Sequence, residues 1–466
     1  MNKDDQILKS RDDKAPIVFS KVAEASGTEE SFKLADDSEC SWQKKDEAFG
    51  PAKLRERIEP WLTALFQSEH FELLVGSGLS HAVHQMAANQ ALPGMGTVQF
   101  AEFDTEINTE AKKSAEAAGR MSGNIEDQIR VASELLRGLE IISESKAENT
   151  KELGKKSAAL KNSLSEVLKA FAASVLKGEN GLITAKTKER EKAFNYLVSF
   201  LMSFASRTGT RDRLQIFTTN YDRYLEAGAD VAGLHLLDRF VGSLLPVFRS
   251  SRLDVDMHYN PPGIRGEPRY LEGVAKFTKL HGSLDWVDAE KSIRRMSLPF
   301  GAESIEPYLK APGLAGAGAR QLMIYPNSAK DRETTAYPYV ELFRDFAAAV
   351  CRPNSTLICF GYSFGDEHIN RVIEDMLTIP STHLVVVSYG DPLGRIMQIY
   401  EKMGRHAQIT LLIGNHLGDL QTLVDNYLPK PAIDRTTMRM AELLKSRWSG
   451  SHAAAPPADA KGEGEQ

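Results

Sequence analysis

The sequence predicts an α/β fold, with a doubly wound, parallel, Rossmann-like sheet and a large helical insertion. Short apolar runs recur along the chain, and helical segments separate several of them. Most of these runs are continuously apolar rather than alternating, which is typical of parallel strands covered by helices on both faces. The alternation of strands and helices favours right-handed crossover connections within one sheet.

The predicted strands follow the chain from residue 71 onward. The first lies within FELLVGSGLS at 71–80 and enters a glycine turn. Helical segments such as 338–350 and 368–377 separate several of the later strands. Those later strands are predicted at 214–220, 276–286, 320–326, 356–363, 383–391 and 408–415.

A strongly helical stretch runs from about residue 106 to 205. The lysines of the helix predicted within 151–178 are expected to form a solvated face. A second helix of this stretch is predicted over about 188–205. Because the stretch lies between the first strand–helix unit and the remaining strands, we interpret it as an insertion. Within 151–178 the apolar residues at helical spacing are Leu160, Leu164, Val167, Leu168, Phe171, Val175 and Leu176.

The two ends of the chain differ from its middle in composition. Residues 1–55 are polar and mixed in charge, which predicts a partly flexible N-terminal arm. Residues 56–430 are expected to form the α/β domain with its helical insertion. Residues 431–466 are expected to form a C-terminal helix and a disordered tail, because 449–466 has low-complexity composition.

Composition and charge are those of an ordinary soluble globular protein. The 466 residues are 42% hydrophobic and 26% charged, with a net charge of −6. This charge gives no electrostatic case for binding nucleic acid or a membrane surface. No apolar run approaches the ~18–20 residues that span a bilayer, and the start of the chain lacks the apolar core of a signal peptide. We therefore expect a cytoplasmic protein without direct contacts to nucleic acid or membrane.

The three cysteines, Cys40, Cys351 and Cys359, form no CxxC pair. Neither a disulfide framework nor a cysteine zinc site is therefore expected. We expect no metal cofactor, and no stoichiometric zinc in the purified protein.

Four loops at predicted strand ends carry candidate ligand-binding residues, and in open α/β sheets ligands bind at that edge. The first loop is GSGLS, from Gly76 to Ser80. Its glycines let the backbone approach a pyrophosphate, and the following helix offers unpaired N–H groups. His81 stands where the usual fingerprint has a third glycine, and a plain strand-to-helix turn explains the loop equally well.

The second loop is TTNYD, from Thr218 to Asp222, directly after the strand that begins at residue 214. Two hydroxyls, an amide, a phenol and a carboxylate are crowded into it. A helix cap needs only one such residue, for which Thr219 or Asn220 would be enough. The remaining polar groups favour a ligand site.

The third loop is KLHGS, in which His281 precedes Gly282. A single histidine is most often structural or exposed, but this one stands at a strand end among other candidate loops. Imidazole has a pKa near 6.5, which suits a general base at neutral pH. His281 is therefore a candidate base.

The fourth loop is GYSFGD at 361–366, between a predicted strand and a predicted helix. Gly361 and Ser363 are candidates for contact with a ribose or a phosphate. Asp366 is more simply explained as the N-cap of the helix.

Taken together and in this order, GSGLS, TTNYD, KLHGS and GYSFGD resemble the sirtuin family. They are most similar to its bacterial branch of sirtuin-like NAD hydrolases of anti-phage defence. Typical sirtuins read GAGxS, TQNID and HG, followed by a GTS-type loop. The resemblance covers roughly residues 56–430 and leaves out the arm, the tail and most of the helical insertion. No single motif is specific, but four of them in the family's order form a joint signal.

The chain departs from typical sirtuins in two ways. Deacetylating sirtuins carry a small zinc module with paired CxxC motifs, which three scattered cysteines cannot build, and the helical block stands in its place. TTNYD also differs from TQNID at the glutamine and isoleucine positions, here Thr219 and Tyr221. Contacts around the nicotinamide pocket are therefore expected to differ in detail.

The resemblance implies that NAD is the substrate and that the bond between nicotinamide and ribose is hydrolysed, giving nicotinamide and ADP-ribose. It implies three catalytic residues. Asn220 would orient the ribose or the attacking water, Asp222 would contact the nicotinamide carboxamide, and His281 would accept a proton. Because Asn220 and His281 are polar loop residues, we expect them to contribute little to the fold. The NAD-binding residues implied are Gly76, Ser77, Gly78, Ser80, Thr218, Thr219, Gly361 and Ser363.

Two other functions stay open from the sequence. A protein ADP-ribosyltransferase or deacylase of sirtuin type would use the same pocket, although the missing CxxC pairs count against it. A non-catalytic nucleotide-binding module would regulate or scaffold a partner, but it gives no role to His281 beside an intact TTNYD loop.

A cell cannot tolerate unrestrained loss of NAD, so such a hydrolase is expected to be inactive until it is triggered. The polar arm and the helical insertion are the parts of the chain available for this control. We expect a homo-oligomer and a separately encoded trigger protein, such as an ATPase.

Overall fold

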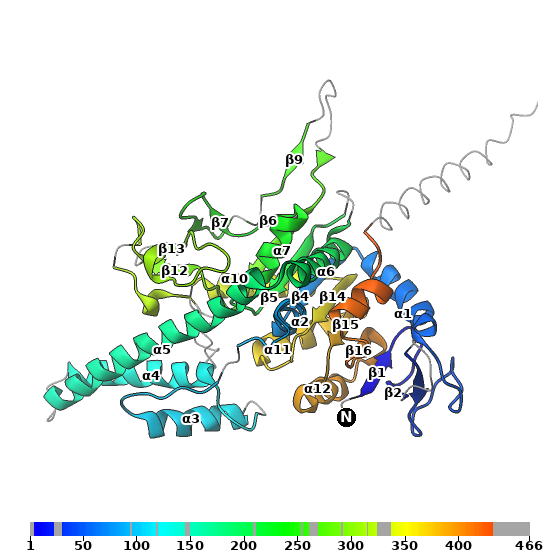
Figure 1. Ribbon diagram of the computed structural model, residues 1–466, viewed down its shortest axis with the longest axis horizontal. Coiled ribbons are helices and arrows are strands. Elements are labelled where there is room, and N and C mark those ends of the chain that lie inside the picture. The colour runs from blue at the N-terminus through cyan, green and yellow to red at the C-terminus, as the bar shows by residue number, and fades with distance from the viewer. Residues whose placement is uncertain are drawn as a thin grey trace, which may run out of the picture.

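The structure is a computed structural model of the chain (Figure 1). It describes residues 4–22, 30–93, 96–117, 120–144, 150–207, 211–251, 253, 255–260, 269–289, 292–314, 316–323 and 337–431. The predicted C-terminal helix and tail lie, from residue 432 onward, outside the described residues.

Ten strands of the described residues form one main sheet, in the order β3-β2-β1-β16-β15-β14-β4-β5-β11-β6. The strands from β16 to β6 in this order are parallel to their neighbours, and this confirms the predicted α/β, Rossmann-like fold. The parallel strands are β4 (His70–Val75), β5 (Leu214–Thr218), β6 (His235–Leu237), β11 (Val274–Lys279), β14 (Ser355–Phe360), β15 (His383–Ser388) and β16 (Ile409–Ile413).

The described part of the N-terminal region belongs to this sheet, which differs from the predicted arm. β1 (Asp5–Lys9) pairs antiparallel with β16, and β2 (Ile17–Lys21) and β3 (Phe32–Leu34) extend the same edge. The sheet is therefore mixed rather than purely parallel. Phe19 and Phe32 are fully buried, with ring centroids 5.4 Å apart. A few well-spaced apolar side chains are thus enough to anchor an otherwise polar segment.

Helices cover both faces of the sheet, which explains why its central strands are apolar throughout. On one face Leu73 and Ile358 pack against α1 (Pro51–Phe66), α2 (Ser77–Ala88), α6 (Thr187–Ala205) and α7 (Tyr224–Ala232). On the other face Leu74 and Leu357 pack against α10 (Tyr339–Val350), α11 (Glu367–Leu377) and α12 (Arg395–Met403). The helix expected at 188–205 is therefore part of the sheet's own cover.

The three other helices of the predicted insertion form a separate layer, which we call the helical block. It consists of α3 (Asp104–Ala117), α4 (Ile125–Ser143) and α5 (Thr150–Thr184). These helices share an apolar core with residues between 284 and 322, among them Leu284 and Val287. The 35 residues of α5 span about 52 Å, and Figure 1 shows this helix running outward from the sheet. Helices in this stretch were predicted, but the boundaries of the domains stay a prediction.

The segment after β11 departs from the predicted strands. The run expected at 276–286 is divided into β11 and β12 (Trp286–Ala289), and the loop between them carries His281. Where a strand was expected at 320–326, the described residues form a short helix, Ala319–Gln321, and a single bridge at Leu322. Residues 324–326 lie outside the described residues.

Smaller elements complete the described structure. β12 joins β13 (Ser292–Arg295), β8 (Val247–Phe248) and β7 (Phe240–Val241) in a second sheet, and β9 (His258–Tyr259) pairs with β10 (Arg269–Tyr270) in a projecting ribbon (Figure 1). The short helices are α8 (Glu306–Leu309), η2 (Ala319–Gln321), η3 (Pro392–Gly394), η4 (His406–Gln408), α13 (Leu420–Thr422) and η5 (Leu423–Tyr427).

Candidate functional site

The four loops singled out in the sequence lie at the carboxyl ends of four neighbouring parallel strands. GSGLS follows β4, TTNYD follows β5, KLHGS follows β11 and GYSFGD follows β14. These strands are adjacent in the order β14-β4-β5-β11. Segments that are far apart in the sequence therefore meet at one edge of the sheet.

The glycines of the first and fourth loops bring two backbones into direct contact. A Cβ atom on Gly76 would lie 2.4 Å from the carbonyl oxygen of Gly361, and one on Gly78 would lie 2.6 Å from its Cα. Gly361 itself has a φ of +61°, which favours glycine. The Gly78 N–H donates to the Gly361 carbonyl at 3.0 Å. Close packing of the two loops accounts for these glycines. The Gly78 N–H is already hydrogen-bonded within the protein.

The N-terminus of α2 lies beside this contact. Gly76 is its N-cap residue, and Ser77 in the first turn is exposed. The positive end of the helix dipole and the free N–H groups of a first turn attract anions such as phosphate. A phosphate could therefore bind at the N-terminus of α2, but the Gly78 N–H is not available to it because it donates to Gly361.

Asn220, Ser80 and Asp222 form one hydrogen-bonded chain. The Asn220 Nδ2 donates to the Gly76 carbonyl at 3.0 Å and to the Ser80 Oγ at 3.1 Å. Ser80 in turn donates to Asp222 Oδ2 at 2.8 Å, and the other oxygen of Asp222 accepts from the Tyr224 N–H at 3.3 Å. Asn220 and Ser80 are both buried. Three residues predicted for the site are therefore held together, and the amide of Asn220 has a fixed orientation.

Thr218 and Thr219 have mainly structural contacts. The Thr218 hydroxyl donates to the Val75 carbonyl at 2.9 Å and accepts from the Asn220 N–H at 3.1 Å. The Thr219 N–H donates to the same Val75 carbonyl at 3.3 Å. Thr218 is buried and Thr219 is half-buried, so Thr219 is the better placed of the two to meet a ligand.

His281 forms a close pair with Asp366. Its Nε2 lies 2.7 Å from Asp366 Oδ2, and the His281 side chain is 18% exposed. The imidazole ring lies between two aromatic rings, with centroid distances of 6.3 Å to Tyr221 and 6.5 Å to Phe343. Asp366 is also the N-cap of α11, because its Oδ1 accepts from the His368 N–H at 3.0 Å. The predicted cap is confirmed, and its second role as a histidine partner was missed.

Ser363 is half-buried in the loop after β14. A Cβ atom on the neighbouring Gly365 would lie 3.5 Å from the Ser363 Oγ and 2.8 Å from the Arg395 guanidinium. Arg395, the first residue of α12, therefore stands beside the loop that was predicted to contact a ribose or a phosphate. Sequence patterns do not single out Arg395, since an arginine that opens a helix carries no motif.

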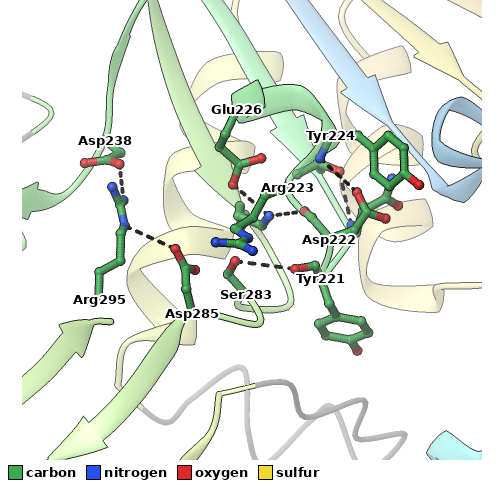
Figure 2. Close-up of polar contacts among 12 residues, drawn as sticks. Tyr221, Asp222, Arg223, Tyr224, Glu226, Asp238, Ser283, Asp285 and Arg295 are labelled. Atoms are coloured by element: carbon green, nitrogen blue, oxygen red, sulfur yellow. Dashed lines mark hydrogen bonds and ion pairs between the residues drawn. The ribbon is translucent and has the colours of Figure 1, made fainter. Parts of the chain in front are cut away.

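Lys279, at the end of β11, supports the TTNYD loop through contacts with Asp222 and Glu226, both of which are labelled in Figure 2. Its buried Nζ donates to the Asp222 carbonyl at 2.5 Å and pairs with Glu226 at 2.8 Å. Burial raises the pKa of the Asp222 carboxyl, and the charge of Lys279 opposes this rise. Burial likewise raises the pKa of Glu226. This lysine was not identified from the sequence because residue type alone does not distinguish a buried lysine from a surface one.

A cleft of about 1110 Å³ lies next to the glycine contact. Gly78, Gly361, His81 and Tyr389 are among the residues that line it, together with residues from the start of α6. Its lining does not include Asn220, Asp222 or His281. The cleft therefore adjoins the glycine loops that were predicted to bind NAD, and the predicted catalytic groups are not part of its lining.

Within the described ranges, no group of three or more histidine, cysteine or acidic side chains has a geometry that would hold a metal ion. Cys40 and Cys351 are partly buried and Cys359 is fully buried, and all three are free thiols. No helix in the same ranges is both long and apolar enough to cross a membrane.

Comparison with known proteins agrees with the geometry of the site. Residues 214–407 match the family model of the SIR2-like domain, and this segment contains the TTNYD, KLHGS and GYSFGD loops. No curated protein matches the chain. The match supports a sirtuin-like family for this chain and an NAD-dependent activity of sirtuin type.

Proposed function

We propose that this protein hydrolyses NAD at the bond between nicotinamide and ribose, giving nicotinamide and ADP-ribose. The observation that carries the proposal is the pair formed by His281 and Asp366, 2.7 Å apart at the carboxyl edge of the sheet. A histidine held by a carboxylate is the arrangement that general-base catalysis uses.

The protonation of the pair follows from its geometry. With Asp366 ionised, the His281 Nε2 carries the proton and donates a hydrogen bond to the carboxylate. The Nδ1 atom is then the ring nitrogen that accepts a proton from water or from a ribose hydroxyl. The carboxylate orients the ring and stabilises the imidazolium that forms.

Asn220 is proposed to orient the reacting groups. Both donors that its amide can offer have partners, because Nδ2 bonds to the Gly76 carbonyl and to Ser80. The carbonyl Oδ1 is therefore the atom with which Asn220 would meet the ribose or the attacking water. When nicotinamide leaves, the ribose resembles an oxocarbenium ion, and a fixed carbonyl dipole near it is favourable.

The remaining roles follow from position. Asp222, fixed by Ser80 and Lys279, would contact the nicotinamide carboxamide. The first turn of α2, with Ser77, would meet the phosphates, and Gly361 and Ser363 would face the adenosine half. The adjoining cleft is large enough for that half of the molecule, since ligand pockets commonly measure about 300–1,000 Å³.

We further propose that the reaction depletes NAD in the cytoplasm as a triggered effector of anti-phage defence. The order of the four motifs supports this role, together with the absence of paired CxxC motifs from the sequence.

Product analysis tests the proposal. Purified protein is incubated with NAD under activating conditions, and nicotinamide, ADP-ribose and protein-bound ADP-ribose are separated and measured. Hydrolysis predicts nicotinamide and free ADP-ribose in equal amounts. Nicotinamide accompanied by protein-bound ADP-ribose would identify a transferase, and binding of NAD without any nicotinamide release would identify a non-catalytic module.

A further inference from the structure

Successive side chains of the loop after β5 contact the candidate site and the helical block in turn. Asn220 and Asp222 point to Ser80, which lies within the candidate site. Tyr221 and Arg223 instead contact the helical block, and Figure 2 shows the Tyr221 ring turned away from the Asp222 carboxylate. Asn220 and Asp222, the two candidate catalytic residues of this loop, therefore alternate along the chain with two residues that bind to the helical block.

Tyr221 connects the helical block with both halves of the candidate site. Its hydroxyl donates to Glu126 in the first turn of α4 at 3.3 Å, and its ring packs edge-on against Phe171 of α5 with centroids 5.8 Å apart. The same ring lies 6.3 Å from the ring of His281. The Tyr221 carbonyl accepts from the Leu284 N–H at 3.0 Å, in the loop after β11. Tyr221 is buried and belongs to the apolar core of the helical block.

Arg223 fixes the other end of the loop by a buried ion pair with Glu179 of α5. Glu179 accepts from the Arg223 backbone N–H at 2.9 Å and from its guanidinium at 2.5 Å. The guanidinium also donates to the Leu298 carbonyl and to the Pro299 carbonyl. Both charged side chains are buried, with Glu179 fully so. The loop is therefore attached to the helical block on both sides of Asp222.

We propose that Tyr221 is a positioning residue, through which the helical block holds Asn220, Asp222 and His281 in the geometry that NAD cleavage requires. The proposal rests on the proposed function. Tyr221 stands at the position where the TQNID pattern has isoleucine, and an isoleucine has no hydroxyl to donate to Glu126. Tyr221, at which TTNYD departs from that pattern, is thus also the residue that contacts the helical block.

The test removes the hydroxyl and keeps the ring, in the variant Tyr221→Phe. Because a small displacement of a reacting group is costly, we expect the kcat of NAD cleavage to fall about fivefold with little change in KM. Glu126→Gln in the Tyr221→Phe background should cause no further loss, because both changes act on one contact. The matched control is Tyr427→Phe, since Tyr427 is also buried and its hydroxyl lies 2.7 Å from His416.

Hydrogen exchange of the peptide that contains residues 218–222 provides a readout that does not depend on catalysis. We expect faster exchange in this peptide in Tyr221→Phe, parental exchange in Tyr427→Phe, and equal melting temperatures. Parental exchange and parental kcat in folded Tyr221→Phe would overturn the proposal. If the parental protein releases no nicotinamide under activating conditions, the proposed function fails, and the exchange result alone then supports or overturns the positioning role.

Discussion

Asp366 serves two partners with its two carboxylate oxygens. Oδ1 caps α11 and Oδ2 holds His281. Asparagine is as good an N-cap residue as aspartate, but it cannot hold the imidazole in the same tautomer or stabilise its charge. The variant Asp366→Asn therefore separates the structural role of this residue from its catalytic role.

For Asp366→Asn we predict a loss of NAD turnover of about 10²-fold or more, with a melting temperature close to the parental value. Nicotinamide release and thermal unfolding, measured on the same preparation, check this. An active variant would reduce Asp366 to a helix cap, and a variant that loses activity only by unfolding would do the same.

Asn220 is expected to contribute more to the stability of the fold than its position in a polar loop indicates. It is 7% exposed, and Nδ2 satisfies both the Gly76 carbonyl and the Ser80 hydroxyl. The burial and the two hydrogen bonds of this side chain weigh against the expectation that it contributes little to the fold. Asn220→Ala leaves buried polar groups without a partner, which costs about 1–3 kcal/mol.

We therefore predict that Asn220→Ala lowers both the turnover of NAD and the free energy of unfolding. Urea unfolding and nicotinamide release measure the two effects separately. Ser80→Ala is the comparison variant, since it removes one of the two bonds of the Asn220 amide, together with the bond from Ser80 to Asp222, and leaves the amide in place. Equal stability of Asn220→Ala and the parental protein would contradict the hydrogen-bonded chain described above.

The sequence predicted the candidate residues better than it predicted their connections. Asn220, Ser80 and Asp222 were singled out by residue type and strand-end position, and the structure brings them together. The partner of His281 was missed because it lies 85 positions away and its cap role already explained it. Local patterns identify polar groups at strand ends, whereas pairs between loops depend on the order of strands in the sheet.

At the scale of elements, the strands within apolar runs were predictable, and the three strands of the polar N-terminal region were not. β4, β5, β14, β15 and β16 coincide with continuous apolar runs because helices cover both of their faces. The strands β1 to β3 lie in a region that is polar and mixed in charge, so their buried side chains were not recognised. The pairing of β1 with β16 joins segments that are far apart in the sequence, which no local pattern encodes.

Glu72 places a carboxyl group inside the central strand β4. It is fully buried, accepts from the Ser355 hydroxyl at 2.6 Å and lies 3.5 Å from the Arg352 guanidinium. Burial raises its pKa from 4.5 to about 7, against the opposing effects of Ser355 and Arg352. The folded state therefore binds this proton more tightly than the unfolded state does. The stability contributed in this way is complete below pH 4.5 and is lost as the pH rises through about 7.

We predict that Glu72→Gln flattens the pH dependence of stability between about pH 4.5 and 7. Glutamine keeps a hydrogen-bonding side chain of the same shape but does not ionise. Urea unfolding at several pH values measures the difference between variant and parent, which should shift in favour of the variant as the pH rises. A difference that is constant with pH would show that Glu72 does not titrate in this range.

At the scale of the whole molecule, two features extend away from the sheet. One is the helical block and the other is the ribbon of β9 and β10, on which Tyr259 and Tyr270 are each 48% exposed (Figure 1). A two-stranded ribbon is marginally stable on its own in water. Both features offer surface that assembly would cover.

We predict that the protein forms homo-oligomers and is inactive until a separately encoded trigger, such as an ATPase, engages it. Light scattering gives the oligomeric state, and NAD consumption by the isolated protein gives its basal activity. The expected result is a multimer with little activity of its own. A strict monomer that is fully active alone would contradict this prediction.

The proposed role of His281 is tested most directly by the rate of nicotinamide release from NAD, with the parental protein and His281→Ala compared under activating conditions. Hydrolysis with His281 as the base predicts release by the parental protein and a rate roughly 10²- to 10⁴-fold lower for the variant, the usual contribution of a general base. His281 is a partly exposed loop residue, so the variant should remain folded and still bind NAD. Equal rates for the two proteins, or NAD binding without nicotinamide release by either, would contradict the account.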